Sequence, residues 1–142
     1  MFHSKFQLLV LVPGLLLAGC SDSLQQRAEV SGTVTYRGKP LPGGIVTFIS
    51  DKGFQNSATI DENGHYTISV GIGSNKITVD NRLLKKTQQT TGPRLKPQEG
   101  TTQQTTLTGT YVPIRDIYAS AESSGLGYMV TSGSQVKDIP LE

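Results

Sequence analysis

The strongest constraint on the fold is a series of short segments in which apolar and polar residues alternate. In the segment 30–36, Val30 and Val34 fall on one face and hydroxyl-bearing residues fall on the other. The same period of two recurs over 65–70 and 76–80. This period is typical of half-buried β-strands, because successive side chains of an extended chain point to opposite faces. The pattern therefore predicts an all-β fold.

Turn-forming residues separate these segments and allow further strands to be placed. Glycine and proline are concentrated in 37–44, and an Asp-Glu-Asn-Gly turn occupies 61–64. The intervening segment 45–49 is apolar on both faces and is expected to be a central strand. Pro140 lacks a backbone donor, so the last strand is expected at an edge. The strands are predicted at 30–36, 45–49, 56–60, 65–70, 76–80, 126–130 and 136–141, forming a seven-stranded antiparallel β-sandwich.

A leader of different character precedes this domain. Lys5 is followed by an apolar run over 6–17, the small pair Ala18-Gly19, and then Cys20, the only cysteine of the chain. A basic start, an apolar middle and small residues before a cleavage point are typical of a secretory signal. The apolar run has about a dozen residues, fewer than the roughly 20 that a spanning helix needs.

The four residues Leu17-Ala18-Gly19-Cys20 resemble the lipobox of bacterial lipoproteins. This resemblance implies that 1–19 is a cleaved signal peptide and that Cys20 carries a thioether-linked diacylglycerol anchoring the protein to a membrane. Residues 20–28 would then be a lipidated tether. By resemblance to enterobacterial lipoprotein sorting, in which Asp after the cysteine retains the protein in the inner membrane, Ser21 favours the outer membrane, so we expect a location in the cell envelope. The alternatives are an ordinary cleaved signal with a chance cysteine, or a structural thiol.

The charge balance limits the classes of partner. Without 1–19, which contains a single charged residue, the chain has 12 basic and 11 acidic residues. Nucleic-acid binding usually requires a concentrated basic face, so no nucleic-acid partner is expected. Because no second cysteine is present, no disulfide is expected within the chain, and packing alone must stabilise the domain.

The segment Val-Ser-Gly-Thr-Val-Thr-Tyr-Arg-Gly-Lys-Pro-Leu-Pro-Gly-Gly-Ile-Val-Thr-Phe, at 30–48, resembles the opening of the carboxypeptidase regulatory-like domain. The spacing of Asp61, Gly64 and Tyr66 fits the same family, and the resemblance covers 29–82. It implies a prealbumin-like, or transthyretin-like, sandwich over 29–142. Such domains are common in lipoproteins of planctomycete-type bacteria. A generic β-hairpin is the alternative interpretation of this pattern.

The segment 85–110 breaks the strand pattern. It is strongly polar, and Thr-Gln-Gln-Thr-Thr occurs at both 87–91 and 102–106. Such a composition buries too little apolar surface to offset the entropy of ordering. The prediction is a mobile insertion, serving either as a solvated spacer or as an arm that contacts a protein or glycan partner.

Residues with catalytic chemistry are few. His65 is the only histidine after the leader, and Asp61 and Ser69 are near it in sequence, but all three are expected to be exposed. With one histidine and no free cysteine, the domain has too few good ligands for a zinc site. The turn residues Asp61, Glu62 and Asn63 lack the ligand spacing of a calcium loop. No enzyme activity, metal or cofactor is therefore predicted.

The predicted function is that of a non-catalytic, membrane-anchored lipoprotein with a structural or protein-interaction role. The alternative is a carbohydrate- or protein-binding module that uses the 85–110 arm. In that case Tyr36, Tyr111 and Tyr118 are the candidates for stacking on sugars, although aromatic residues in this setting are more often part of the core. A hydrolase is the least favoured hypothesis.

Overall fold

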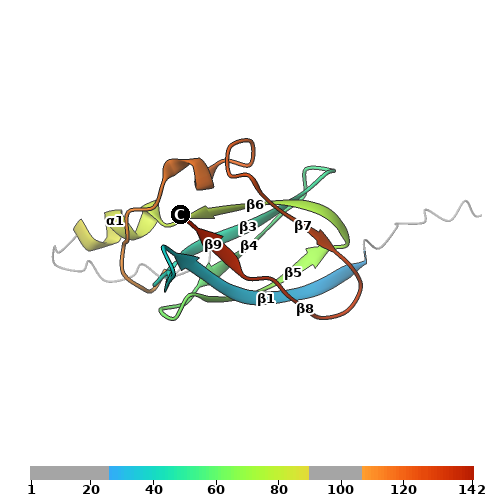
Figure 1. Ribbon diagram of the computed structural model, residues 1–142, viewed down its shortest axis with the longest axis horizontal. Helices are drawn as coiled ribbons and strands as arrows, with labels where there is room; N and C mark the ends of the chain where they lie inside the picture. The colour runs from blue at the N-terminus through green and yellow to red at the C-terminus, as the bar shows by residue number, and fades with distance from the viewer. Residues whose placement is uncertain (1–25, 90–106) are drawn as a thin grey trace, which may run out of the picture.

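The computed structural model describes residues 26–89 and 107–142, which form two β-sheets (Figure 1). The five-stranded sheet contains β1 (Arg27–Tyr36), β2 (Lys39–Pro40), β5 (His65–Gly71), β8 (Gln135–Val136) and β9 (Ile139–Leu141). The four-stranded sheet has the order β4 (Gln55–Ile60), β3 (Gly44–Ser50), β6 (Gly73–Asp80) and β7 (Leu126–Val130). Helix α1 (Arg82–Gln89) and the 3₁₀ helix η1 (Asp116–Ala119) connect β6 to β7. The predicted all-β class is confirmed.

The hydrophobic core lies between the two sheets. Val30 and Val34 of β1 are fully buried, as are Phe48 of β3 and Ile77 of β6. Phe48 packs against Tyr66 of β5, with ring centroids 6.2 Å apart. Because apolar residues occupy every second position, each strand contributes one face to this core. Burying each large side chain stabilises the fold by about 1.5–3 kcal/mol relative to leaving it exposed.

Strand β1 is the centre of the five-stranded sheet. β5 pairs with it in antiparallel orientation, whereas β8 and β9 pair with it in parallel orientation. The expected purely antiparallel sandwich is therefore wrong for this sheet. The described residues form nine strands rather than seven, because β2 adds a short pair to β1 and the expected last strand is divided into β8 and β9.

The gap between β8 and β9 is closed by specific contacts to β1. The Lys137 amide donates to the Ser31 carbonyl oxygen at 2.7 Å, and the Asp138 carboxylate accepts from the Thr33 amide at 2.9 Å. The Tyr66 hydroxyl donates to the Lys137 carbonyl oxygen at 2.6 Å. A Cβ at Gly32 would lie 2.0 Å from that oxygen. Glycine is therefore required here by close approach of two backbones, not by an unusual φ angle.

Two other expectations change at the ends of the domain. β1 begins at Arg27, and Ala28 is buried, so ordered structure starts before the expected boundary at 29. Residues 85–89 of the predicted 85–110 insertion belong to α1, so this part is helical rather than a loop. Residues 90–106, and the leader with Cys20, lie outside the described residues. Within 26–89 and 107–142, no helix combines the length and apolar character needed to cross a bilayer.

Replacing Gly32 should test the contact between β1 and the C-terminal segment. Gly32→Ala is expected to lower the free energy of unfolding by about 1–3 kcal/mol or more, because the added methyl group overlaps the Lys137 carbonyl. Urea denaturation of the purified protein measures this change. Gly127→Ala in β7 is the matched control, since its Cβ would meet only the Asn75 carbonyl oxygen at 3.6 Å. Equal stability losses in the two variants would contradict this assignment.

Candidate functional site

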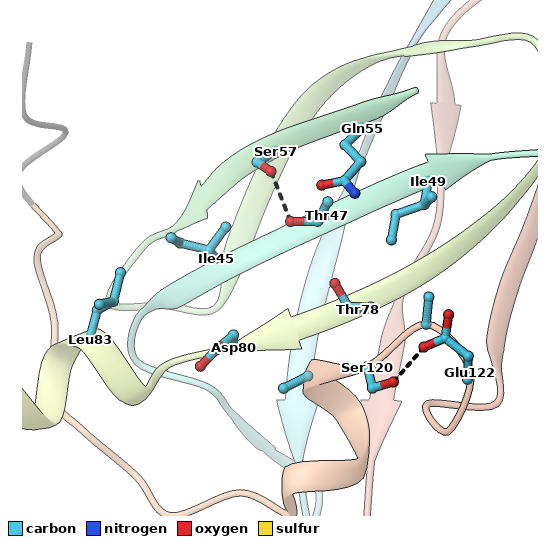
Figure 2. A pocket seen from close by; sticks show the side chains of 12 residues that line it. Ile45, Thr47, Ile49, Gln55, Ser57, Thr78, Asp80, Leu83, Ser120 and Glu122 are labelled. Atoms are coloured by element: carbon cyan, nitrogen blue, oxygen red, sulfur yellow. Dashed lines mark hydrogen bonds between the residues drawn. The ribbon is translucent and has the colours of Figure 1, made fainter. Parts of the chain in front are cut away.

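A cleft of about 550 Å³ lies on the outer face of the four-stranded sheet, and we call it the sheet-face cleft (Figure 2). Its floor comes from β4, β3 and β6, one end comes from α1, and its wall comes from the segment 119–122, which begins at the last residue of η1. The lining residues are Ile45, Thr47, Ile49, Gln55, Ser57, Thr78, Asp80, Leu83, Ala119, Ser120, Ala121 and Glu122. A smaller hollow of about 270 Å³ shares Ile49, Ala121 and Glu122 with it and extends it toward the β3–β4 turn.

A row of hydroxyl groups crosses the floor of the cleft. Thr47 of β3 is in register with Ser57 of β4 on one side and with Thr78 of β6 on the other. The Thr47 and Ser57 hydroxyl oxygens are hydrogen-bonded at 2.8 Å (Figure 2). Ile45 and Ile49 flank this row, because outward residues of β3 occur at every second position. The floor therefore offers hydrogen-bonding groups between two apolar patches.

The wall is the segment 119–122, which is fastened to β6. The buried Ser124 hydroxyl donates to the Ile77 carbonyl oxygen at 2.8 Å, and the Ser123 hydroxyl donates to the Ile117 carbonyl oxygen at the same distance. At the rim, the Ser120 hydroxyl donates to a Glu122 carboxylate oxygen at 2.7 Å. This hydrogen bond lowers the pKa of Glu122 below its ordinary value. The wall thus presents an ionised carboxylate beside small apolar side chains.

The end of the cleft farther along the chain direction of β6 lies at the junction of β6 and α1. The Asp80 carboxylate accepts hydrogen bonds from the backbone amide of Arg82 at 2.9 Å and from its guanidinium group at 2.5–3.0 Å. The side-chain hydrogen bonds from Arg82 hold the pKa of Asp80 below its ordinary value. Leu83, 48% exposed, completes this end of the cleft. At this end of the cleft the negative charge of Asp80 is therefore compensated by the positive charge of Arg82.

The residues considered for catalysis from the sequence do not form a buried site. His65 Nδ1 lies 3.7 Å from Asp61 Oδ2, and their side chains are 64% and 53% exposed. Asp61 Oδ1 accepts from the backbone amides of Asn63 and His65 at 2.8 Å, so this carboxylate caps the turn. Ser69 is exposed farther along β5. The described part of the chain contains no group of three or more His, Cys, Asp or Glu side chains arranged to hold a metal ion.

The three candidate tyrosines lie apart from the sheet-face cleft. Tyr118 is buried, and its hydroxyl bonds the backbone of Glu142 at 2.8 and 3.1 Å. Tyr36 is half-buried and packs against the core. Tyr111 is half-buried, with the Lys85 ammonium 5.8 Å from its ring centroid. The core interpretation is confirmed for Tyr118, and none of the three lines the cleft.

The sheet-face cleft was not predicted from the sequence. The outward isoleucines of β3 were a signal, because a contiguous apolar patch on an outer face often marks a binding groove. The wall left no signal, since 119–122 has no regular period.

Neither a family model nor a curated protein matches the sequence. A solved structure with some similarity is a DUF3823 family protein from Parabacteroides merdae, at 12% sequence identity and a TM-score of 0.40. The alignment covers 82% of this chain and 46% of that protein, so this chain spans about half of its length. At this TM-score the similarity decides neither topology nor activity, and membership of the carboxypeptidase regulatory-like family stays a prediction.

The Asp80–Arg82 pair should make stability depend on pH. Because the folded-state pKa of Asp80 is lowered, its contribution is present above the unfolded pKa and is lost as pH falls through the folded pKa. Asp80→Asn is therefore expected to reduce the free energy of unfolding near pH 7, and the difference from wild type should shrink as pH falls below about 4, the unfolded-state pKa of an aspartate. Urea denaturation across this pH range measures both effects.

The matched control is Asp51→Asn, which removes an exposed carboxylate that forms no ion pair among the described residues. It should change stability by less than about 0.5 kcal/mol. A stability difference for Asp80→Asn that persists unchanged at low pH would show that the ion pair is not its cause.

Proposed function

We propose that this protein is a non-catalytic, lipid-anchored β-sandwich of the bacterial cell envelope that binds another protein through the sheet-face cleft. The observation that carries the proposal is the cleft itself, in which a hydroxyl row lies between two isoleucines under a wall fastened to β6. Concave surfaces with apolar patches and a few convergent polar groups are the usual form of binding sites.

The chemistry of the cleft supports a peptide segment as its ligand. The floor pairs hydroxyl groups of Thr47 and Ser57 with apolar patches at Ile45 and Ile49, which matches a chain of alternating amide groups and apolar side chains. The Asp80 carboxylate is already engaged by Arg82, so little uncompensated charge is present at that end. A polypeptide with few charges fits such a surface better than a polyanion.

Glycan binding is the second candidate, and the lining of the cleft favours it less. Aromatic side chains present the flat apolar faces on which sugar rings stack, and none of the described lining residues is aromatic. The 85–110 arm proposed for glycan contact falls mainly outside the described residues.

We propose that two or three acyl chains attached at Cys20 anchor the protein to the membrane. Metabolic labelling tests this anchor. Each buried methylene contributes about 0.8 kcal/mol, so two or more chains hold a protein stably on a membrane. Cells fed an alkyne-palmitate analogue should label the wild-type protein, and Cys20→Ala should abolish the label. Ser21→Ala is the matched control and should label normally. Persistent labelling of Cys20→Ala would refute the anchor without affecting the proposed binding at the cleft.

Binding at the cleft is tested by photo-crosslinking in the native bacterium. A benzophenone amino acid at Gln55, inside the cleft, is expected to yield a discrete protein adduct. The same group at Thr67, exposed on β5 of the other sheet, is the control and should not yield that adduct. Ala121→Arg should fill the cleft and remove the adduct while leaving the thermal midpoint nearly unchanged. Identical adducts from both positions would contradict a cleft-specific partner.

A further inference from the structure

A separate hollow lies at the turn between β1 and β2, and we call it the hairpin cleft. It has a volume of about 370 Å³, and its lining residues are Tyr36, Arg37, Lys39, Pro40, Leu41, Pro42 and Val112. The lining is mainly apolar, and its two charged members are both cations. It shares no residue with the sheet-face cleft and plays no part in the function proposed above.

Arg37, one of the two cations, lies in the β1–β2 turn and has a backbone conformation that is unfavourable for arginine. Tyr36 pairs with Lys39, so Arg37 and Gly38 form a two-residue loop, with φ angles of 50° and 76°. Two positive φ values define a type I′ turn, whose first position prefers Asn, Asp or Gly. Among the described residues, Arg37 is the sole non-glycine residue with a positive φ. The hairpin alone gives no reason for arginine at this position.

The Arg37 side chain is held over the hairpin cleft. Its guanidinium carbon lies 5.2 Å from the centroid of the Tyr36 ring, and its backbone amide donates to the Leu141 carbonyl oxygen at 2.9 Å. Both Arg37 and Lys39 are exposed, and within 26–89 and 107–142 neither forms a salt bridge. The cleft therefore combines an apolar floor with two cations that have no anionic partner in the described structure.

We propose that the hairpin cleft binds an acidic peptide segment of a protein partner. An apolar side chain of the peptide would lie on the floor formed by Tyr36 and Pro40, and a carboxylate of the peptide would contact Arg37 and Lys39. Charge complementarity selects the anion, and a planar guanidinium is suited to bidentate contact with a carboxylate. The prolines and the tyrosine supply a rigid apolar surface, and ligand sites are lined mainly by apolar and aromatic side chains. The excess of cations is too small for a polynucleotide, which needs an extended basic face.

The test uses a phage-displayed random heptapeptide library selected on the full chain purified in detergent. Peptides with a carboxylate next to an apolar residue should be enriched. The most enriched peptide, labelled with tetramethylrhodamine, is then titrated by fluorescence polarisation. Arg37→Asn, combined with Lys39→Gln, should weaken binding by about tenfold or more, and binding to wild type should weaken as salt rises. Asn suits the left-handed position, so the thermal midpoint should stay equal or rise.

Lys52→Gln is the matched control, because it removes an exposed cation from the β3–β4 turn, outside both clefts, and should leave the affinity unchanged. Three results would overturn the proposal: no enrichment of acidic peptides, equal affinity for wild type and the double variant, or displacement of the peptide by short-chain phosphatidylglycerol at lower concentration than by unlabelled peptide. The last result would assign the cleft to an anionic lipid. Each leaves the crosslinking result at the sheet-face cleft unaffected.

Discussion

The rest of the structure depends on the pairing of the C-terminal segment with β1. Asp138 accepts a hydrogen bond from the Thr33 amide across 105 residues of sequence, and β9 continues the ladder to Tyr36. Contacts over such a separation form only after a large loss of chain entropy. The five-stranded sheet is therefore complete only when β8 and β9 have paired with β1. Gly32 permits this pairing because any larger residue would displace the Lys137 carbonyl.

The same pairing determines where the sheet-face cleft forms. After α1 the chain must return to β7 at the edge of the four-stranded sheet before β8 and β9 can reach β1 (Figure 1). On that path η1 and 119–122 lie beside β6, where Ser124 is fastened to Ile77. In the sheet-face cleft, 119–122 forms a wall beside β6, whereas β3 and β4 form an open floor. The cleft lies where the wall meets this floor. The cleft therefore follows from the route of the chain.

Local periodicity was sufficient to predict most strands but not their arrangement. The alternation around Val30 and the turn at Gly64 each correspond to observed elements, because both are set by neighbouring residues. Parallel pairing of β9 was not predictable, since alternation is the same in parallel and antiparallel strands. Helix α1 was missed because its apolar residues are only Leu83 and Leu84, although Asp80 before it is a helix-start signal. The cleft wall, which depends on tertiary contacts alone, had no periodic signal.

β1 connects the proposed anchor to the hairpin cleft. The strand begins seven residues after Cys20, and its ten residues at about 3.3 Å each separate Arg27 from Tyr36 by roughly 30 Å. Because β5 pairs with one side of β1 and β8 and β9 with the other, the strand cannot bend independently of the domain. The hairpin cleft is thus fixed at the end of β1 opposite Arg27. With the proposed anchor at Cys20 holding the Arg27 end nearer the membrane, Arg37 and Lys39 would lie at the far end of β1, where the charge of a soluble partner reaches them more readily than the head groups of the anchoring membrane.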